Sequence, residues 1–262
     1  MQNHKNWYPF DIAISAGRIF RQARALTVLG GVRMNDETCD IHDVTKAASD
    51  LVAFGCSIGA IQLYDSFLQL QFSSIVSSYA NEVIQAVDEG LTSAKQGLRE
   101  IKEEYAELSS KAQFYAHNGV GVLAGIMQVQ TGASLTGNTR GFKAAVGVAY
   151  FAHGVNNIYE GVGNIYNGPE TPGVVGPIRE GYQWLAGDVH TGNIVYYSVD
   201  LSLSAFGALK PVRKVGSTEF FTRDPLNYER AYKQMSRLSL AFEALVDSIT
   251  IKSLTDEFIS KQ

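Results

Sequence analysis

The sequence predicts an all-α protein: a multi-helix bundle with a long heptad helix and a central glycine-rich helical hairpin. Three observations indicate this fold. Apolar residues recur every three or four positions through most of the chain, strand-like alternation is nowhere sustained, and glycine and proline clusters separate segments of helical length. At 262 residues, the chain suits one large domain or two small ones. We expect a helical N-terminal region over residues 1–112 and a glycine-rich helical domain over residues 113–262.

The composition excludes several classes of protein. A net charge of -4 with scattered Lys and Arg argues against a nucleic-acid binder. Cys39 and Cys56 form neither a disulfide framework nor a metal-type spacing, so we expect no metal and no cofactor. The first residues lack the apolar run of a secretory signal. We therefore expect synthesis in the cytoplasm, with any export carried out by a dedicated secretion system.

The N-terminal region begins with a predicted helix from Asp11 to Leu29, which Gly30 and Gly31 end. A weakly charged tract follows from Leu51 to Asn81, with Asp65 as its only ionised residue. Gly55 and Gly59 lie four residues apart, a spacing that lets two helix backbones approach closely. Both a buried core helix and a membrane-facing segment fit this tract.

A charged helix is predicted from about Tyr79 to Tyr115. Its apolar residues alternate at spacings of four and three, as in a heptad seam: Val87, Leu91, Ala94, Leu98, Ile101, Tyr105, Leu108, Ala112 and Tyr115. The pattern fits an amphipathic helix packed on the rest of its domain, and it also fits a self-associating coiled coil.

The glycine-rich hairpin runs from Asn118 to Tyr166, and the turn-like segment 136–141 divides it into two arms. Glycine inside a helix costs about 1 kcal/mol relative to alanine, so these glycines indicate close packing against another helix. We expect two facing grooves, one formed by Gly121, Gly125 and Gly132 and the other by Gly147, Gly154 and Gly161. A buried hairpin and a hairpin that inserts into a membrane both fit, although polar residues in each arm argue against a constitutive span.

The second arm carries the first group of candidate catalytic residues. His153, Asn156, Asn157 and Glu160 are spaced to share one helical face. Such a stripe could hold a proton relay, a ligand or a metal, or it could form a structural hydrogen-bond network. His190 and Asp200 make a second candidate pair. The catalytic candidates are therefore His153, Asn157, Glu160, His190 and Asp200.

The C-terminal third is predicted to continue as helices. A loop rich in glycine and proline covers residues 167–177, and a short helix covers residues 179–186. A turn from Asp188 to Asn193 precedes a weakly charged helix from Ile194 to Leu209. Asp224 and Pro225 predict the start of the last helix, as an N-cap residue followed by proline.

Residues 118–254 resemble an uncharacterised bacterial family of domains of unknown function. The resemblance is carried by the glycine-rich arm and by the segments HGVNNIYEGVGN (153–164), GPIREGY (176–182), GNIVYYSVDLSLSAFGAL (192–209) and ERAYKQMSRLSLAFEALVDSIT (229–250). It implies an effector delivered by a contact-dependent or type VI secretion system. A target membrane, a cognate immunity protein or a secretion-system adaptor would then be the partners.

Functions from different classes remain open at this point. The first is a toxin that inserts the hairpin into a target membrane. The second is a soluble enzyme or ligand-binding protein that uses the five catalytic candidates. A third is an interaction protein that forms a homo-oligomer through its heptad helix.

Overall fold

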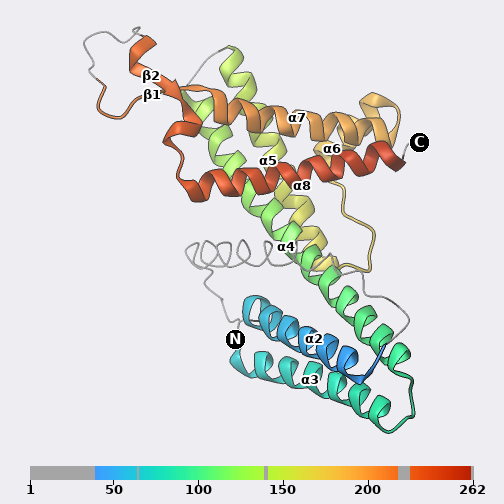
Figure 1. Ribbon diagram of the computed structural model, residues 1–262. Helices are drawn as coiled ribbons and strands as arrows, with labels where there is room; N and C mark the ends of the chain where they lie inside the picture. Colours follow the sequence, from blue (N-terminus) through green and yellow to red (C-terminus); the bar gives the residue numbers. More distant parts are fainter. Residues whose placement is uncertain (1–38, 64, 139–140, 218–224, 261–262) are drawn as a thin grey trace, which may run out of the picture. The chain divides into compact units, whose positions relative to one another are not determined.

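The protein is an all-α multi-helix bundle, as the sequence predicts (Figure 1). The computed structural model describes residues 39–63, 65–138, 141–217 and 225–260. The predicted helix from Asp11 to Leu29 lies outside these residues. The described elements are α2 (Ile41–Gln62), α3 (Ser66–Asp88), α4 (Ala94–Asn138), α5 (Phe142–Asn167), α6 (Pro177–Ala186), α7 (Val189–Leu209), β1 (Pro211–Arg213), η2 (Pro225–Asn227), β2 (Tyr228–Arg230), η3 (Ala231–Gln234) and α8 (Arg237–Ser260).

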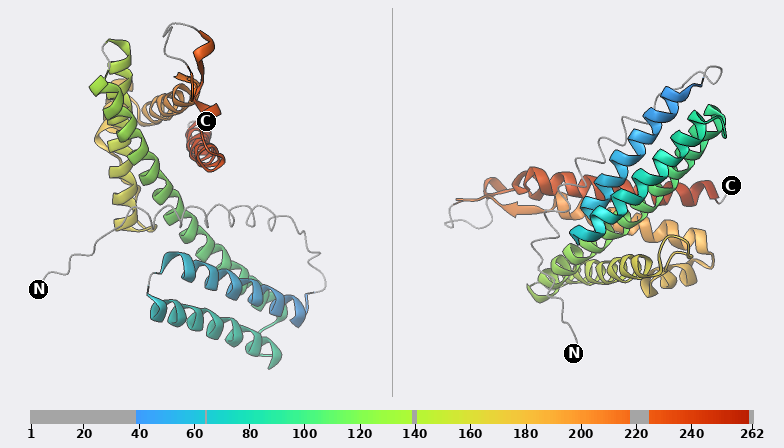
Figure 2. Two further views of the ribbon diagram at one scale, coloured as in Figure 1. Left: turned by 90° about the vertical axis from the view of Figure 1, so that its left-hand side faces the viewer. Right: turned by 90° about the horizontal axis from the view of Figure 1, so that it is seen from below.

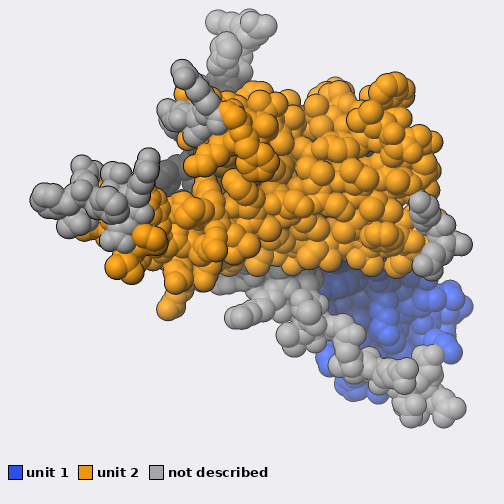
Figure 3. Space-filling view, turned by 90° about the horizontal axis from the view of Figure 1, so that it is seen from above, with its two compact units in different colours: residues 1–116 blue, residues 117–262 orange. Residues whose placement is uncertain are grey.

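The chain divides into two compact units, residues 1–116 and residues 117–262 (Figure 3). The division lies within α4, so this helix contributes its first half to one unit and its second half to the other. The sequence placed the division at residue 112, in the same helix.

The first unit packs α2, α3 and the first half of α4 around one apolar core. Its buried centre contains Val44, Ala48 and Leu51 from α2, Ala80 and Val83 from α3, and Ile101 from α4. Asp40 caps α2 through a reciprocal capping box with Asp43. Asp65 caps α3 by accepting hydrogen bonds from two backbone N–H groups, so the one carboxylate of the weakly charged tract separates two helices.

The predicted continuous helix from Tyr79 to Tyr115 is wrong, because the chain turns between α3 and α4. Gly90 has a φ of 71°, a left-handed conformation that favours glycine. Val87 before the turn and Ala94 after it both pack against the same core, whereas Leu91 in the turn is exposed. The heptad spacing of apolar residues therefore continues across the turn, because α3 and α4 both pack against the same core.

The second unit contains the rest of α4, the helices α5 to α8 and a small antiparallel strand pair. Helix α7 packs against both α6 and α8. Strand β1 pairs with β2, so the C-terminal third is not purely helical. The predicted last helix begins at Arg237 rather than at Asp224 and Pro225, because η2, β2 and η3 occupy residues 225–234.

The start of α7 also differs from the prediction. Asp188 accepts a hydrogen bond from the backbone N–H of Thr191 and caps a helix that begins at Val189. The segment from Asp188 to Asn193 is therefore the first turn of α7 and not a separate loop. This extension places Asn193 on a helix, where it joins the polar network described below.

By length and apolar composition, one helix among the described residues is capable of crossing a membrane. It is α2, of which 28% of the tested window is buried.

Candidate functional site

The hairpin of α4 and α5 is held by contact between two backbones. The helices run antiparallel and side by side (Figures 1 and 2). A Cβ added to Gly154 would lie 2.6 Å from the carbonyl oxygen of Gly125, and one added to Gly132 would lie 2.5 Å from the backbone nitrogen of Phe151. Since real Cβ atoms do not approach backbone this closely, glycine is required at these positions.

Gly147 and Gly161 extend the same contact toward the two ends of the crossing. A Cβ at Gly147 would lie 2.9 Å from the backbone nitrogen of Thr136, and one at Gly161 would lie 2.9 Å from the carbonyl oxygen of Asn118. Gly121 differs, because nothing lies within 4 Å of its Cβ position. Five of the six glycines that the sequence grouped therefore line the contact, and Gly121 does not.

The polar stripe of α5 turns toward α6 and α7. His153 is 1% exposed, and its ring stacks on Tyr196 with a centroid distance of 4.6 Å and an interplanar angle of 6°. Its Nε2 lies 3.2 Å from the Tyr182 hydroxyl. Its Nδ1 lies 3.3 Å from Asp200 Oδ1 without an aligned hydrogen bond, so this buried nitrogen has no hydrogen-bond partner.

Asp200 and Tyr196 are tied to both arms of the hairpin through amide side chains. Gln128 on α4 donates to Asp200 Oδ1 at 2.8 Å, and its own Oε1 accepts from Asn157 on α5 at 2.8 Å. The Tyr196 hydroxyl donates to Asn157 Oδ1 at 2.7 Å and accepts from Asn156 at 3.0 Å. One continuous chain of hydrogen bonds therefore joins α4, α5 and α7.

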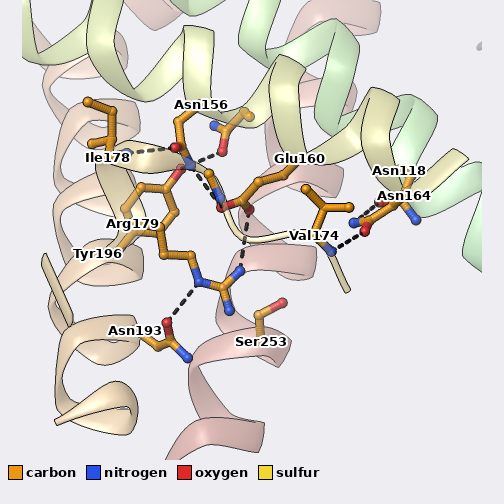
Figure 4. A network of polar contacts seen from close by, with 12 residues as sticks. Asn118, Asn156, Glu160, Asn164, Val174, Ile178, Arg179, Asn193, Tyr196 and Ser253 are labelled. Carbon is orange, nitrogen blue, oxygen red and sulfur yellow. Dashed lines mark hydrogen bonds and ion pairs between the residues drawn. The ribbon is translucent and has the colours of Figure 1, made fainter. Parts of the chain in front are cut away.

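Glu160 fixes the loop before α6 (Figure 4). Its Oε1 accepts from the backbone N–H of Gly176 at 2.8 Å and from Asn156 at 2.9 Å, and its Oε2 lies 3.3 Å from Arg179 Nη1. Arg179 also donates through Nε to Asn193 on α7, and its guanidinium lies over the Tyr197 ring. The carboxylate thus anchors both the loop and the first turn of α6 to α5.

The predicted pairing of His190 with Asp200 is wrong. Both residues lie on α7, and ten residues of helix separate them by about 15 Å. His190 Nδ1 instead lies 2.8 Å from Glu257 Oε2 on α8, and Glu257 Oε1 accepts from Asn193 at 2.6 Å. Asp200 lies against His153. The five catalytic candidates are therefore in two places, with His153, Asn157, Glu160 and Asp200 in the network and His190 at its edge toward α8.

Burial changes the acidity of the tyrosines in this network. Desolvation raises the pKa of Tyr196 far above its ordinary value, and the nearby carboxylates of Glu160 and Asp200 raise it further. Desolvation also raises the pKa of Tyr182 and of Tyr197. These phenols are therefore neutral hydrogen-bonding groups at physiological pH.

The arrangement is that of a closed structural network. His153 and Asn156 are almost completely buried, and the carboxylates of Asp200 and Glu160 accept hydrogen bonds from protein donors. Among the described residues, no group of three or more His, Cys, Asp and Glu side chains could hold a metal ion. The candidates predicted from the sequence did not include Gln128, Tyr182, Arg179, Asn193, Tyr196 and Glu257. A helical spacing of three connects Arg179 with Tyr182 and Asn193 with Tyr196.

Comparison with known proteins supplies a family without a known activity. No curated protein and no solved structure matches the chain. The family described as "Protein of unknown function (DUF4225)" matches residues 89–236, which reach from the end of α3 to the residue before α8. Because this match covers more than half of the sequence, the chain belongs to the DUF4225 family.

Proposed function

We propose that the protein acts on membranes by inserting the α4–α5 hairpin, as a toxin in antagonism between bacteria. The observation that carries the proposal is the glycine contact between the two arms. It lies in a segment, from Ala112 to Tyr166, whose only ionised residues are Arg140, Lys143 and Glu160.

The glycine contact between α4 and α5 is of a kind that is maintained when the surrounding water is replaced by lipid. In water, most helix pairs are held by burial of apolar side chains, and this driving force disappears between helices in lipid. Contacts between small residues and backbone persist there, because they depend on van der Waals packing rather than on water. Gly125, Gly132, Gly147 and Gly154 make such contacts along the crossing. The two arms are thus able to remain paired after they leave the soluble fold.

The polar stripe favours a permeability defect over a simple anchor. Glu160 and His153 would be costly to expose to lipid, and polar groups within a membrane face protein or a water-filled path. In the folded protein, groups on α6, on α7 and in the loop before α6 contact this stripe. After insertion, the same residues would face other hairpins or a conducting path.

The in-vitro test is release of a fluorescent dye from sealed anionic vesicles. Met127→Lys places a charge on the exposed face of α4, where Met127 is 41% exposed, so the soluble fold tolerates it. A lysine at the centre of a membrane helix costs about 2.5–3.5 kcal/mol, so we expect dye release to slow roughly 100-fold. Val195→Lys on α7, at a residue that is 40% exposed, is the matched control and should release dye like the wild type.

Vesicles that stay sealed at high protein concentration between pH 5 and pH 8 would refute membrane action. In cells, expression with a periplasmic signal should depolarise the inner membrane and stop growth, whereas cytoplasmic expression should not. Toxicity that is equal from both sides and leaves the membrane potential unchanged would instead point to a soluble target.

A further inference from the structure

Helix α5 has three faces of different chemistry, each about 120° from the next at 100° of rotation per residue. Gly147, Gly154 and Gly161 form the face against α4. The stripe from His153 to Glu160 forms the face against α6 and α7. The third face, which we call the outer seam, consists of Val148, Ala152, Val155, Tyr159, Val162 and Tyr166.

The outer seam is an exposed apolar stripe. Its spacings are four, three, four, three and four, which is the pattern of a helix that packs against another helix. Val148 is 59% exposed, Val155 44%, Tyr159 56%, Val162 52% and Tyr166 89%. A contiguous apolar stripe of this kind on a folded surface marks an interaction site.

We propose that the outer seam pairs with the outer seam of a second copy of this chain, helix against helix and antiparallel. Between Lys143 and Glu160, which is paired with Arg179, α5 has no Asp, Glu, Lys or Arg, so self-pairing brings no like charges together. The size of the seam residues also favours an antiparallel pair. The first half of the seam carries Val148 and Ala152, and the second half carries Tyr159 and Tyr166, so antiparallel pairing sets smaller residues against larger ones.

A lipid surface is a poorer occupant of the seam while the protein is folded. A helix that lies on a membrane keeps a polar face in water and is rich in Lys and Arg on that face. The polar face of α5 is buried against α6 and α7, and Lys143 is its one basic residue. The pairing of two copies concerns the soluble protein before any insertion, and it does not depend on membrane action.

The size of the seam sets the strength of the pair. From Val148 to Tyr166 the helix is about 28 Å long, and a strip about 10 Å wide covers roughly 280 Å² on each copy. Stable protein complexes bury about 800 Å² on each partner. We therefore expect a reversible dimer that forms in the range of about 10 µM to 1 mM.

Analytical ultracentrifugation of the full chain without lipid tests this pairing. The wild type should move from its monomer mass of 28.6 kDa toward twice that mass as its concentration rises through this range. Val155→Glu, at the centre of the seam, should stay monomeric with an unchanged circular dichroism spectrum. Val195→Glu on α7 is the control at matched exposure and should dimerise like the wild type.

Cross-linking gives the geometry of the pair. In a Cys39→Ser, Cys56→Ser background, Val155→Cys should form a disulfide dimer faster than Tyr166→Cys, because an antiparallel pair brings the centres of the two seams together and separates their ends. Faster linkage at Tyr166 would show parallel pairing and overturn the proposed geometry. A wild type that remains monomeric at 1 mM would overturn self-association, and vesicle binding lost in Val155→Glu would then assign the seam to lipid. Dye release is measured separately, so either proposal can fail alone.

Discussion

Gly154→Ala is the most direct test of the backbone contact between α4 and α5. The added Cβ would lie 2.6 Å from the carbonyl oxygen of Gly125 and 2.7 Å from the backbone nitrogen of Val129. Ordinary contact begins at 3.4 Å, so the two helices must separate by about 0.8 Å. Neither atom belongs to a flexible side chain, and therefore local adjustment cannot relieve the clash.

The expected free-energy change combines two opposing effects. Overpacking costs about 1–3 kcal/mol, and a rigid contact lies at the upper end of this range. Alanine regains about 1 kcal/mol of helix propensity relative to glycine. We expect Gly154→Ala to lower the free energy of unfolding by about 2 kcal/mol. Gly121→Ala, in the same hairpin but with open space around its Cβ position, should raise it by about 1 kcal/mol.

Urea unfolding followed by circular dichroism measures the difference, and hydrogen exchange of the α5 amides assigns it to the second unit. The double variant Gly125→Ala, Gly154→Ala should cost less than the sum of its single changes, because one separation of the helices relieves both clashes. Equal stability of Gly154→Ala and Gly121→Ala would refute the clash at the backbone contact, since the two changes differ only in what surrounds the new methyl group.

Three further changes test the polar network and its edge. Tyr196→Phe should lower the free energy of unfolding by about 1–2 kcal/mol at pH 8. Above pH 10, the difference in this free energy between the variant and the wild type should become smaller. Because the pKa of Tyr196 is raised in the folded state, ionisation of this phenol in the unfolded chain destabilises the wild type, and Tyr196→Phe lacks this loss. A difference in the free energy of unfolding that stays constant from pH 8 to pH 11 would contradict this. Glu243 lies on α8, beside the network, and accepts a hydrogen bond from Ser204 on α7. Burial raises the pKa of Glu243, so its contribution to stability is complete at acid pH and is lost as pH rises. Denaturant titrations should therefore show the stability of Glu243→Gln rising relative to that of the wild type between pH 4 and pH 7. Glu160→Gln should lower the free energy of unfolding by about 2 kcal/mol and weaken the attachment of the loop before α6. The amide hydrogen of Gly176 should then exchange faster with solvent. An unchanged exchange rate at Gly176 would contradict the role of the carboxylate.

The helical elements were largely predictable from local pattern. The second arm of the hairpin was expected over residues 142–166, and α5 covers Phe142–Asn167. The wrongly predicted helix boundaries lie where contacts between distant segments, rather than local sequence pattern, determine the structure. The turn at Gly90 interrupts a heptad pattern that continues on both sides, and β2, which pairs with β1, occupies residues expected to begin the last helix, so that helix starts at Arg237.

The polar network was only half predictable. Residues on one helix face follow from spacing, so the stripe from His153 to Glu160 could be recognised. Their partners come from α4, α6 and α7, and nothing local connects Gln128 with Asp200 across 72 residues. The pairing of His190 with Asp200 was attractive because both residues lie near each other in sequence, but a helix holds them on separate turns.

The three faces of α5 also determine what should limit insertion of the hairpin. Under the proposed membrane action, the glycine face would travel with α4 and the outer seam is already exposed, so opening of the polar face would have to precede insertion. Asp200→Ala removes the acceptor of Gln128 and the charge beside buried His153, which should lower the cost of opening by about 3 kcal/mol. Each 1.4 kcal/mol is a factor of ten, so dye release should accelerate up to about 100-fold if opening limits its rate. Urea unfolding must first show that Asp200→Ala is destabilised. If this variant then releases dye more slowly than the wild type or at the same rate, the contacts of the polar face do not hold the hairpin in the folded protein.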